Sequence, residues 1–212
     1  MTKMTNKQSP SFVIAISGSS GSGKTSLVQK VTSLLEDAVS LYFDDYAAVS
    51  TYPSNFSEWI REGADPNQWK TPQLLEDLQM LRRGEAISLP GNKGMVKSAS
   101  FIVMEEPFGR ERAGMNELID FVVCIDLPLE VALARRLLRD IEWCLSERNA
   151  EYLALYLKEY LTGYLGGATR EMYLEVNTRV LRNCDLALDG IKSIDELADE
   201  IVVALKTKLG TV

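Results

Sequence analysis

Short apolar runs alternate with stretches of helical periodicity along this chain. Runs with the length and composition of buried parallel strands cover residues 11–17, 39–43, 100–104, 120–125 and 185–188. Apolar residues at helical spacing predict helices over residues 26–35, 71–83, 128–145, 150–165, 169–181 and 193–209. The alternation predicts an α/β fold of three layers, α/β/α, with a five-stranded, mainly parallel sheet.

Capping residues mark the start of two of these helices. Thr71 suits the N-cap position, with Pro72 at the first helical position, and Ser193 can form a capping box with Glu196. Residues 87–97 contain one proline and two glycines, so we expect a loop or a weak hairpin there.

A glycine-rich loop joins the first strand to the first helix. Residues 18–25 match the pattern G-x-x-x-x-G-K-[ST] in full, and the flanking strand and helix favour a phosphate-binding loop over a chance glycine–serine turn. Glycine lets successive N–H groups turn towards an anion, and the helix that follows adds its positive end. Lys24 would contact the β- and γ-phosphates, and Thr25 would contact Mg²⁺. The predicted nucleotide contacts are Gly18, Ser19, Ser20, Gly21, Ser22, Gly23, Lys24, Thr25 and Ser26.

Acidic pairs follow two further strands, as Asp44-Asp45 and Glu105-Glu106. The carboxyl ends of parallel strands meet at one edge of a sheet, so these pairs should lie beside the phosphate loop. There Asp44 can accept the proton of an attacking hydroxyl, and Glu105 can hold Mg²⁺ together with Thr25. The alternative is that the acidic pairs only cap the elements that follow them.

Three arginines lie on the predicted helix 128–145. Arg135 and Arg139 are one turn apart, and Arg136 has the spacing to pair with Asp140. The planar guanidinium group grips phosphate oxygens in two places, so we expect at least one of the three arginines to reach a phosphate. The alternative is a solvated basic face with weak surface ion pairs.

The composition limits the function further. The chain has 212 residues, a net charge of −7 and no histidine, so a general base must be a carboxylate, a lysine or a tyrosine. The negative charge disfavours nucleic acid as a partner, and no stretch is long and apolar enough to predict a membrane span. Residues 1–10 are polar and lack the apolar centre of a signal peptide. We expect a flexible tail there, on a cytoplasmic protein whose residues 11–212 form a single domain.

With these segments placed, the chain resembles the uridine kinase–phosphoribulokinase family of P-loop kinases. The resemblance rests on the loop at 16–25, Phe-Asp-Asp-Tyr at 43–46, the segment 74–90, the strand 102–105 that ends in glutamate, and Arg-Arg-x-x-Arg-Asp within 133–140. The order and spacing hold from about residue 12 to residue 190. The resemblance implies a P-loop NTPase fold with a helical lid over roughly residues 135–170.

The activity that the resemblance implies is transfer of the γ-phosphoryl group of ATP, with Mg²⁺, to a hydroxyl of a small molecule, first of all a nucleoside. Its catalytic set would be Asp44, Lys24, Arg135 and Arg139, with Arg136 at the nucleotide and Glu105 beside the metal. The alternatives are another small alcohol, a sugar phosphate or a nucleotide as acceptor, or a nucleotide-dependent switch without phosphoryl transfer. A homo-oligomer stays open.

The chain departs from the family where the acceptor should bind. Residues 91–95, Gly-Asn-Lys-Gly-Met, lack the tyrosine, aspartate, histidine and arginine that uridine kinases tend to carry there, and residues 107–112 also differ from the usual linker. We therefore expect the acceptor near residues 46–70, 91–98 and 107–112, and these departures leave its identity open.

Overall fold

Five parallel strands form the centre of the molecule. The structure, a computed structural model, describes residues 10–146 and 150–210, so all but the last residue of the predicted tail lies outside the described residues. The sheet has the order β2-β5-β1-β6-β7, and every neighbouring pair in it is parallel. Its strands are β1 (Phe12–Ser17), β2 (Ala38–Leu41), β5 (Phe101–Glu105), β6 (Phe121–Asp126) and β7 (Leu186–Asp189). The predicted five-stranded parallel sheet is confirmed.

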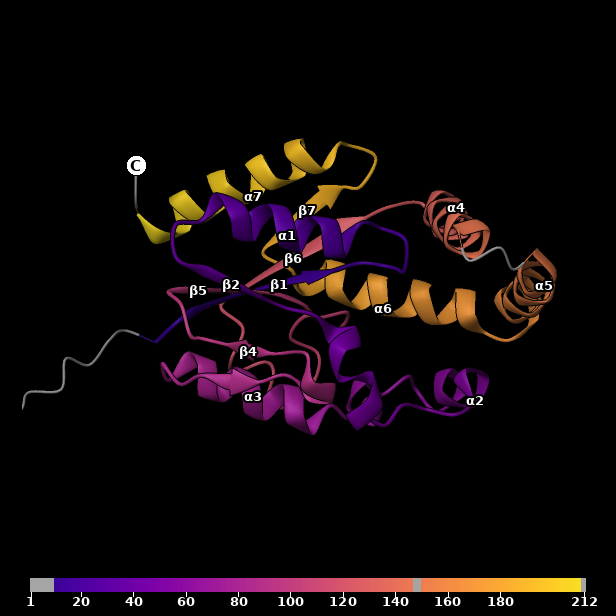
Figure 1. The fold of residues 1–212 in the computed structure, drawn as a ribbon, viewed down its shortest axis with the longest axis horizontal. Helices are drawn as coiled ribbons and strands as arrows, with labels where there is room; N and C mark the ends of the chain where they lie inside the picture. The colour runs from indigo at the N-terminus through magenta and orange to yellow at the C-terminus, as the bar shows by residue number, and fades with distance from the viewer. Residues whose placement is uncertain (1–9, 147–149, 211–212) are drawn as a thin grey trace, which may run out of the picture.

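Helices cover both faces of the sheet, which gives the predicted three layers (Figure 1). One face carries α1 (Lys24–Leu34) and α7 (Ile194–Leu209), and the other carries α3 (Pro72–Arg82) and α6 (Thr169–Asn183). Beyond the carboxyl edge of the sheet, α4 (Leu129–Ser146) and α5 (Ala150–Gly166) pack on each other. The remaining elements are α2 (Phe56–Arg61), the short 3₁₀ helices η1 (Phe43–Val49), η2 (Pro66–Gln68) and η3 (Pro90–Asn92), and the hairpin of β3 (Ile87–Ser88) with β4 (Met95–Val96).

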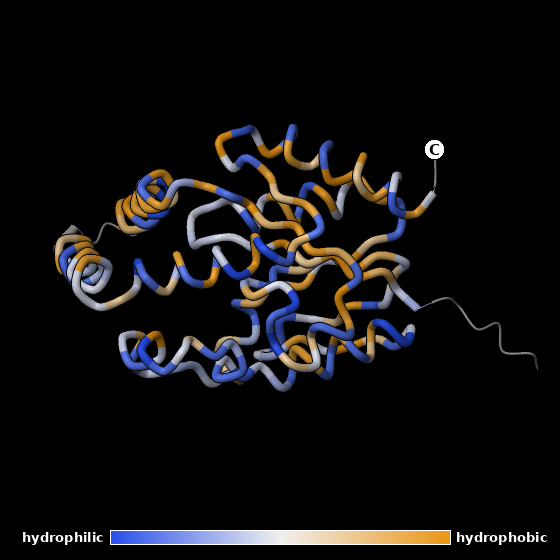
Figure 2. The backbone as a smooth tube through the Cα atoms, turned by 180° about the vertical axis from the view of Figure 1, so that it is seen from behind, coloured by the Kyte–Doolittle hydropathy of each residue, from blue (hydrophilic) through white to orange (hydrophobic). Residues whose placement is uncertain are grey.

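The central strand β1 divides its side chains between two hydrophobic cores. Val13 and Ala15 belong to the core beneath α3 and α6, whereas Ile14 and Ile16 belong to the core beneath α1 and α7. All four side chains are fully buried, as period-two alternation in a doubly covered strand requires. Figure 2 shows the result, with hydrophobic positions gathered in the central strands.

Most predicted elements lie close to their expected limits, and two local features differ in detail. The second strand ends at Leu41, because Phe43 already begins η1. The capping box of Ser193 and Glu196 is confirmed, and residues 87–97 form the expected hairpin. Thr71 holds the N-cap position of α3 but caps no backbone N–H group, because its hydroxyl accepts a hydrogen bond from Arg112 instead.

Candidate active site

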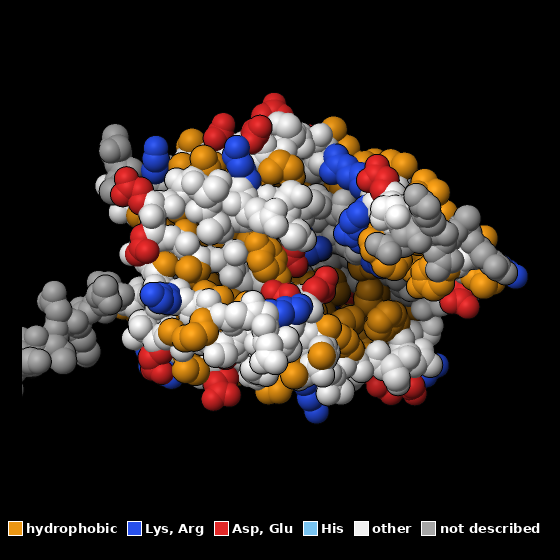
Figure 3. All heavy atoms as spheres, in the orientation of Figure 1, with side chains coloured by type: hydrophobic (Ala, Val, Ile, Leu, Met, Phe, Trp, Pro, Cys, Tyr) orange, Lys and Arg blue, Asp and Glu red, His pale blue; other side chains and the backbone are white. Residues whose placement is uncertain are grey.

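A cavity of about 930 Å³ opens at the carboxyl edge of the sheet. Figure 3 shows it as a hollow in the surface, with basic side chains above it and hydrophobic ones lining its lower right. The charged side chains that line it are Lys24, Asp44, Glu105, Arg135, Arg136 and Arg139. The structure thus brings together every charged residue that the sequence predicted for the site, from four separate segments.

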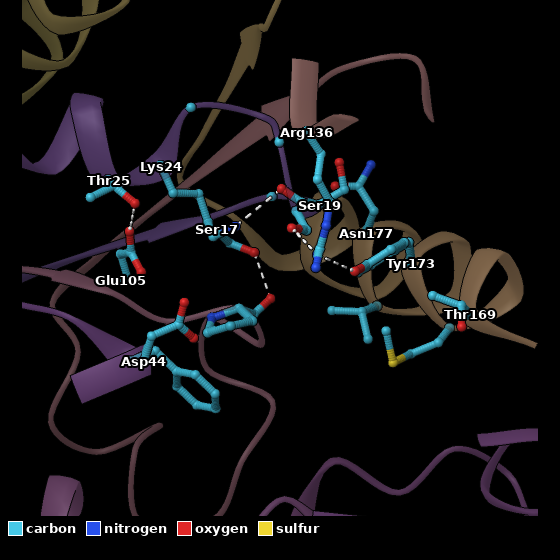
Figure 4. Close-up of a pocket in the computed structure, with 18 of the residues that line it drawn as sticks. Ser17, Ser19, Lys24, Thr25, Asp44, Glu105, Arg136, Thr169, Tyr173 and Asn177 are labelled. Atoms are coloured by element: carbon cyan, nitrogen blue, oxygen red, sulfur yellow. Dashed lines mark hydrogen bonds between the residues drawn. The ribbon is translucent and has the colours of Figure 1, made fainter. Parts of the chain in front are cut away.

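The phosphate loop, residues 18–25, lies between β1 and α1 on the wall of this cavity. The Lys24 ammonium donates a hydrogen bond to the Ser19 carbonyl oxygen at 3.1 Å, so it folds back over the loop (Figure 4). No side chain among the described residues caps α1, which leaves the N–H groups of its first turn available to an anion. The geometry is that of a phosphate cradle.

Gly21 allows the phosphate loop to pack closely against α4. Gly21 has φ +88°, and a Cβ atom at this position would lie 2.2 Å from the Ala132 carbonyl oxygen of α4. Only glycine combines that backbone conformation with so close an approach.

The predicted contact Ser22 is different, because its side chain is fully buried and does not line the cavity. Ser22 can contribute to phosphate binding only through its backbone.

Charges around Lys24 define the electrostatics of the site. Partial burial lowers the pKa of Lys24, and Arg139 and Arg136 act in the same direction, whereas Glu105 and Asp44 oppose it. Three cations, Lys24, Arg136 and Arg139, therefore face the same cavity. Phosphate oxygens would relieve that repulsion, so the site suits a polyanion.

Asp44 is held at the cavity by the packing of η1. Tyr46, in the same 3₁₀ helix, donates a hydrogen bond to the buried carboxylate of Asp77 on α3, at 2.8 Å. The neighbouring Asp45 pairs instead with Lys93 at 2.6 Å and does not line the cavity. Of the acidic pair, only Asp44 is therefore placed to meet a substrate.

Glu105 supplies the second carboxylate of the cavity, and it pairs with Thr25 of the phosphate loop. The Thr25 hydroxyl donates a hydrogen bond to Glu105 Oε1, and Figure 4 shows the two side chains facing each other. Burial raises the pKa of Glu105, although Thr25 and Lys24 oppose the shift. A divalent cation would offset the cost of ionising this carboxyl group.

The donor chemistry of this position fits Mg²⁺. Mg²⁺ is commonly bound by one or two carboxylates together with substrate phosphates and water, and here a hydroxyl and a carboxylate lie side by side next to the phosphate loop. Among residues 10–146 and 150–210, no group of three acidic or cysteine side chains could hold a metal alone. Thr25 and Glu105 would therefore hold the ion with the help of nucleotide phosphates.

The three arginines of α4 line the cavity in different ways. Arg136 donates a hydrogen bond to the Ser20 hydroxyl at 2.6 Å and pairs with Asp140 at 3.5 Å, the i, i+4 pairing that its spacing indicated. Arg135 donates to the Gly190 carbonyl oxygen at 3.1 Å. Arg139 keeps 63% of its side chain exposed and pairs with Asp140 at 3.3 Å.

Sequence reasoning missed an aromatic wall that also lines the cavity. This aromatic wall consists of Phe43, Phe56, Trp69 and Phe108. The ring centroids of Phe56 and Trp69 lie 5.7 Å apart and nearly parallel, and those of Trp69 and Phe108 lie 5.3 Å apart. The wall comes from four segments separated along the chain, so no local motif could have revealed it.

Tyrosines beside Arg136 were also missed. Its guanidinium carbon lies 4.5 Å from the ring centroid of Tyr160, and its Nη1 lies 3.5 Å from the Tyr173 hydroxyl. Both tyrosines line the cavity. A signal existed for the first, because tyrosines recur every four residues at 152, 156, 160 and 164 and stack along one face of α5.

Comparison with known proteins identifies the family of this chain. The model of the KAP family P-loop domain matches residues 1–156. A uridine kinase of Macrococcus caseolyticus is 30% identical over 146 residues, which cover 63% of this chain and 71% of that protein. The chain belongs to the P-loop kinases of the uridine kinase-like family, with a KAP family P-loop domain.

Solved structures support the fold of this P-loop kinase. A candidate fructose transport system kinase from Silicibacter sp. TM1040 superposes with a TM-score of 0.56 at 15% identity, over 87% of this chain and 93% of that one. A gluconokinase from Sinorhizobium meliloti 1021 gives 0.51 at 15% identity, over 94% of each chain. At such identity these likenesses concern the fold alone.

The relative named a uridine kinase supports a place for this chain among the small-molecule P-loop kinases. No helix within the described residues, 10–146 and 150–210, is both long and apolar enough to cross a bilayer.

Proposed function

We propose that this P-loop kinase transfers the γ-phosphoryl group of ATP to a hydroxyl of a nucleoside. The observation that carries the proposal is that one cavity is lined both by the phosphate loop with six charged side chains and by the aromatic wall. We call the first group the donor half and the wall the acceptor half. Asp44 directly follows Phe43 of the wall, so the candidate base adjoins both groups of residues.

In the proposed reaction the acceptor oxygen attacks the γ-phosphorus. A new phosphorus–oxygen bond forms, the bond from the γ-phosphorus to the bridging oxygen of the β-phosphate breaks, and ADP leaves. The Asp44 carboxylate takes the proton that the acceptor hydroxyl loses. Lys24 and the N–H groups of the phosphate loop stabilise the triphosphate oxygens. Mg²⁺, when bound, neutralises phosphate charge, and Thr25 and Glu105 would hold it.

The arginines of α4 complete the donor half. Arg135 and Arg139 supply positive charge to the transferred group, and Arg136 holds the nucleotide against Ser20 of the loop. The helices α4 and α5, which cover most of residues 135–170, act as the lid in this proposal. Closure of such a hairpin would exclude water and so favour transfer to the acceptor over hydrolysis.

The chemistry of the acceptor half favours a nucleoside over a sugar phosphate. Arg112, the arginine that contacts the wall, is already paired with Glu106 and does not line the cavity, so it is not available to a sugar phosphate. Aromatic side chains suit a planar base, since base–aromatic stacking is worth about 1–3 kcal/mol per base. The relative from Macrococcus caseolyticus, named a uridine kinase, is consistent with this choice.

The test measures ADP release with Mg·ATP, alone and with a panel of nucleosides, sugars and sugar phosphates. The proposal predicts stimulation by nucleosides and its loss in Lys24→Ala. Asp44→Asn should lower kcat by about 10²–10⁴-fold, the usual contribution of a general base. Asp45→Asn is the matched control and should retain activity, because Asp45 does not line the cavity.

Other outcomes distinguish the alternatives. Stimulation by sugar phosphates alone would exclude a nucleoside acceptor. Nucleotide binding without turnover on any acceptor would favour a nucleotide-dependent switch. Full activity of Asp44→Asn would show that another group takes the proton.

A further inference from the structure

A buried ion pair lies behind the aromatic wall and takes no part in the chemistry described above. It joins Glu106, the residue after β5, to Arg112 in the turn that follows. Glu106 is completely buried and Arg112 is 4% exposed. Their closest nitrogen–oxygen distance is 2.5 Å, and a second contact joins Arg112 Nε to Glu106 Oε1 at 3.1 Å. The pair is therefore bidentate and dry.

Arg112 also contacts three of the four residues of the aromatic wall. Its Nη1 donates hydrogen bonds to the Trp69 carbonyl oxygen at 2.9 Å and to the Thr71 hydroxyl at 2.7 Å. Its guanidinium carbon lies 5.5 Å from the ring centroid of Phe43 and 5.8 Å from that of Phe108. One planar group thus spans segments that are far apart in the sequence.

Glu106 fixes the same wall from the other side. Its Oε1 accepts a hydrogen bond from the backbone N–H group of Phe108 at 3.2 Å. The Phe108 ring is therefore held through its own backbone and through Arg112. An ion pair with a bidentate fork and additional hydrogen bonds defines position sharply, although such a pair adds little to stability compared with well-packed apolar residues.

We propose that Glu106 and Arg112 are positioning residues that set the aromatic wall, and with it the affinity for the acceptor. The inference rests on the proposed function, since it assigns the wall to the acceptor. Neither residue lines the cavity, so neither touches a substrate. Their effect reaches the acceptor through Phe43, Trp69 and Phe108, and leaves the phosphate loop unaffected.

The decisive variant replaces both partners, as Glu106→Gln with Arg112→Met. Removing one partner alone would leave a buried charge uncompensated, which destabilises a protein strongly. In the double variant no charge is stranded, and the glutamine can still accept from the Phe108 amide. The matched control is Arg82→Met with Asp120→Asn, which removes a partly buried bidentate pair whose members do not line the cavity.

Two readouts are measured on folded protein. The first is the steady-state KM for nucleoside and for ATP. The double variant should raise the nucleoside KM by about tenfold, within the range of one lost stacking contact, and leave the ATP KM within about twofold. The control should change neither. Arg112→Lys, which keeps the charge but loses the fork, should give an intermediate nucleoside KM.

The second readout does not depend on turnover. In a Trp143→Phe background the remaining tryptophans are Trp69 in the wall and Trp59, which is only 2% exposed. Acrylamide quenching of tryptophan fluorescence then reports mainly on Trp69. The double variant should be quenched more strongly than both the parent and the control. This readout remains informative if the wild type shows no nucleoside-stimulated turnover, a result that would refute the proposed function alone.

An unchanged nucleoside KM together with unchanged quenching in the folded double variant would overturn the inference. If the double variant does not fold, the inference is tested with Arg112→Lys instead, through the same KM values and the same quenching measurement. An equal rise of the nucleoside and ATP KM values would also contradict it, because the pair would then act on the whole site.

Discussion

The contact between the phosphate loop and α4 makes Gly21→Ala a sharp test of the site. At φ +88° the new Cβ atom would lie 2.2 Å from the Ala132 carbonyl oxygen, 3.0 Å from its carbonyl carbon and 3.2 Å from Arg136 Cβ. Two of these atoms are backbone, so no side-chain rotation can relieve the clash. Either the loop must leave α4 or α4 must retreat by roughly 1 Å, given ordinary van der Waals separations.

The structure sets the size of the effect. A left-handed conformation costs a residue with a side chain about 1–2 kcal/mol, which corresponds to a Tm about 2–8 °C lower for a protein of this size. Displacement of α4 moves Arg135, Arg136 and Arg139 together. A misplacement of about 1 Å can cost about 10²-fold in rate, so we expect kcat/KM for ATP to fall by about that factor.

The assays are thermal denaturation of the apo protein and steady-state kinetics with varied ATP. Gly163→Ala is the matched control, because it lies within α5 and an added Cβ would meet nothing within 4 Å. The control should retain activity and gain up to about 1 kcal/mol of stability, as alanine does over glycine in a helix. If Gly21→Ala keeps the wild-type Tm and kcat/KM, the loop does not pack on α4 as described.

Three further changes have defined outcomes. Trp69→Leu should raise the nucleoside KM about tenfold, from lost stacking, with an unchanged KM for ATP. Burial of Asp185 alone favours its protonated form, but hydrogen bonds from a backbone amide, Lys208 and Arg110 outweigh it and lower the pKa. That carboxylate therefore stabilises the fold above its unfolded pKa of 3.8, so Asp185→Asn should cost about 1–2 kcal/mol in urea denaturation at pH 7, a difference that disappears as the pH falls below about 4. Ser193→Ala removes the capping box of α7 and should lower the free energy of unfolding by about 1 kcal/mol in the same assay.

Sequence reasoning succeeded where the signal is local or follows from sheet topology. The phosphate loop is contiguous, and its strand and helix are its immediate neighbours. To predict that Asp44 and Glu105 line the same cavity, one further rule was needed, namely that parallel strands present their carboxyl ends at one edge of the sheet. Arg136 and Asp140 were paired from helical spacing alone.

The acceptor half could not be read in this way. Phe56 begins the short helix α2 and Trp69 follows the 3₁₀ helix η2, and the packing of both depends on tertiary contacts. Residues 91–98, which were expected near the acceptor, do not line the cavity. Glu106 and Arg112 pair across an irregular turn, and no periodicity in the sequence of that turn predicts the ion pair. Local patterns predict elements, whereas this wall depends on how loops from distant positions pack together.

The most direct test of transfer from ATP to a nucleoside follows the phosphoryl group itself. ATP labelled in its γ-phosphate is incubated with the enzyme, Mg²⁺ and the best nucleoside of the panel, and the products are separated. We expect label in a nucleoside monophosphate in equal amount to the ADP formed, with both lost in Lys24→Ala and strongly reduced in Asp44→Asn. Label found only in inorganic phosphate, at a rate that ignores the nucleoside, would contradict it.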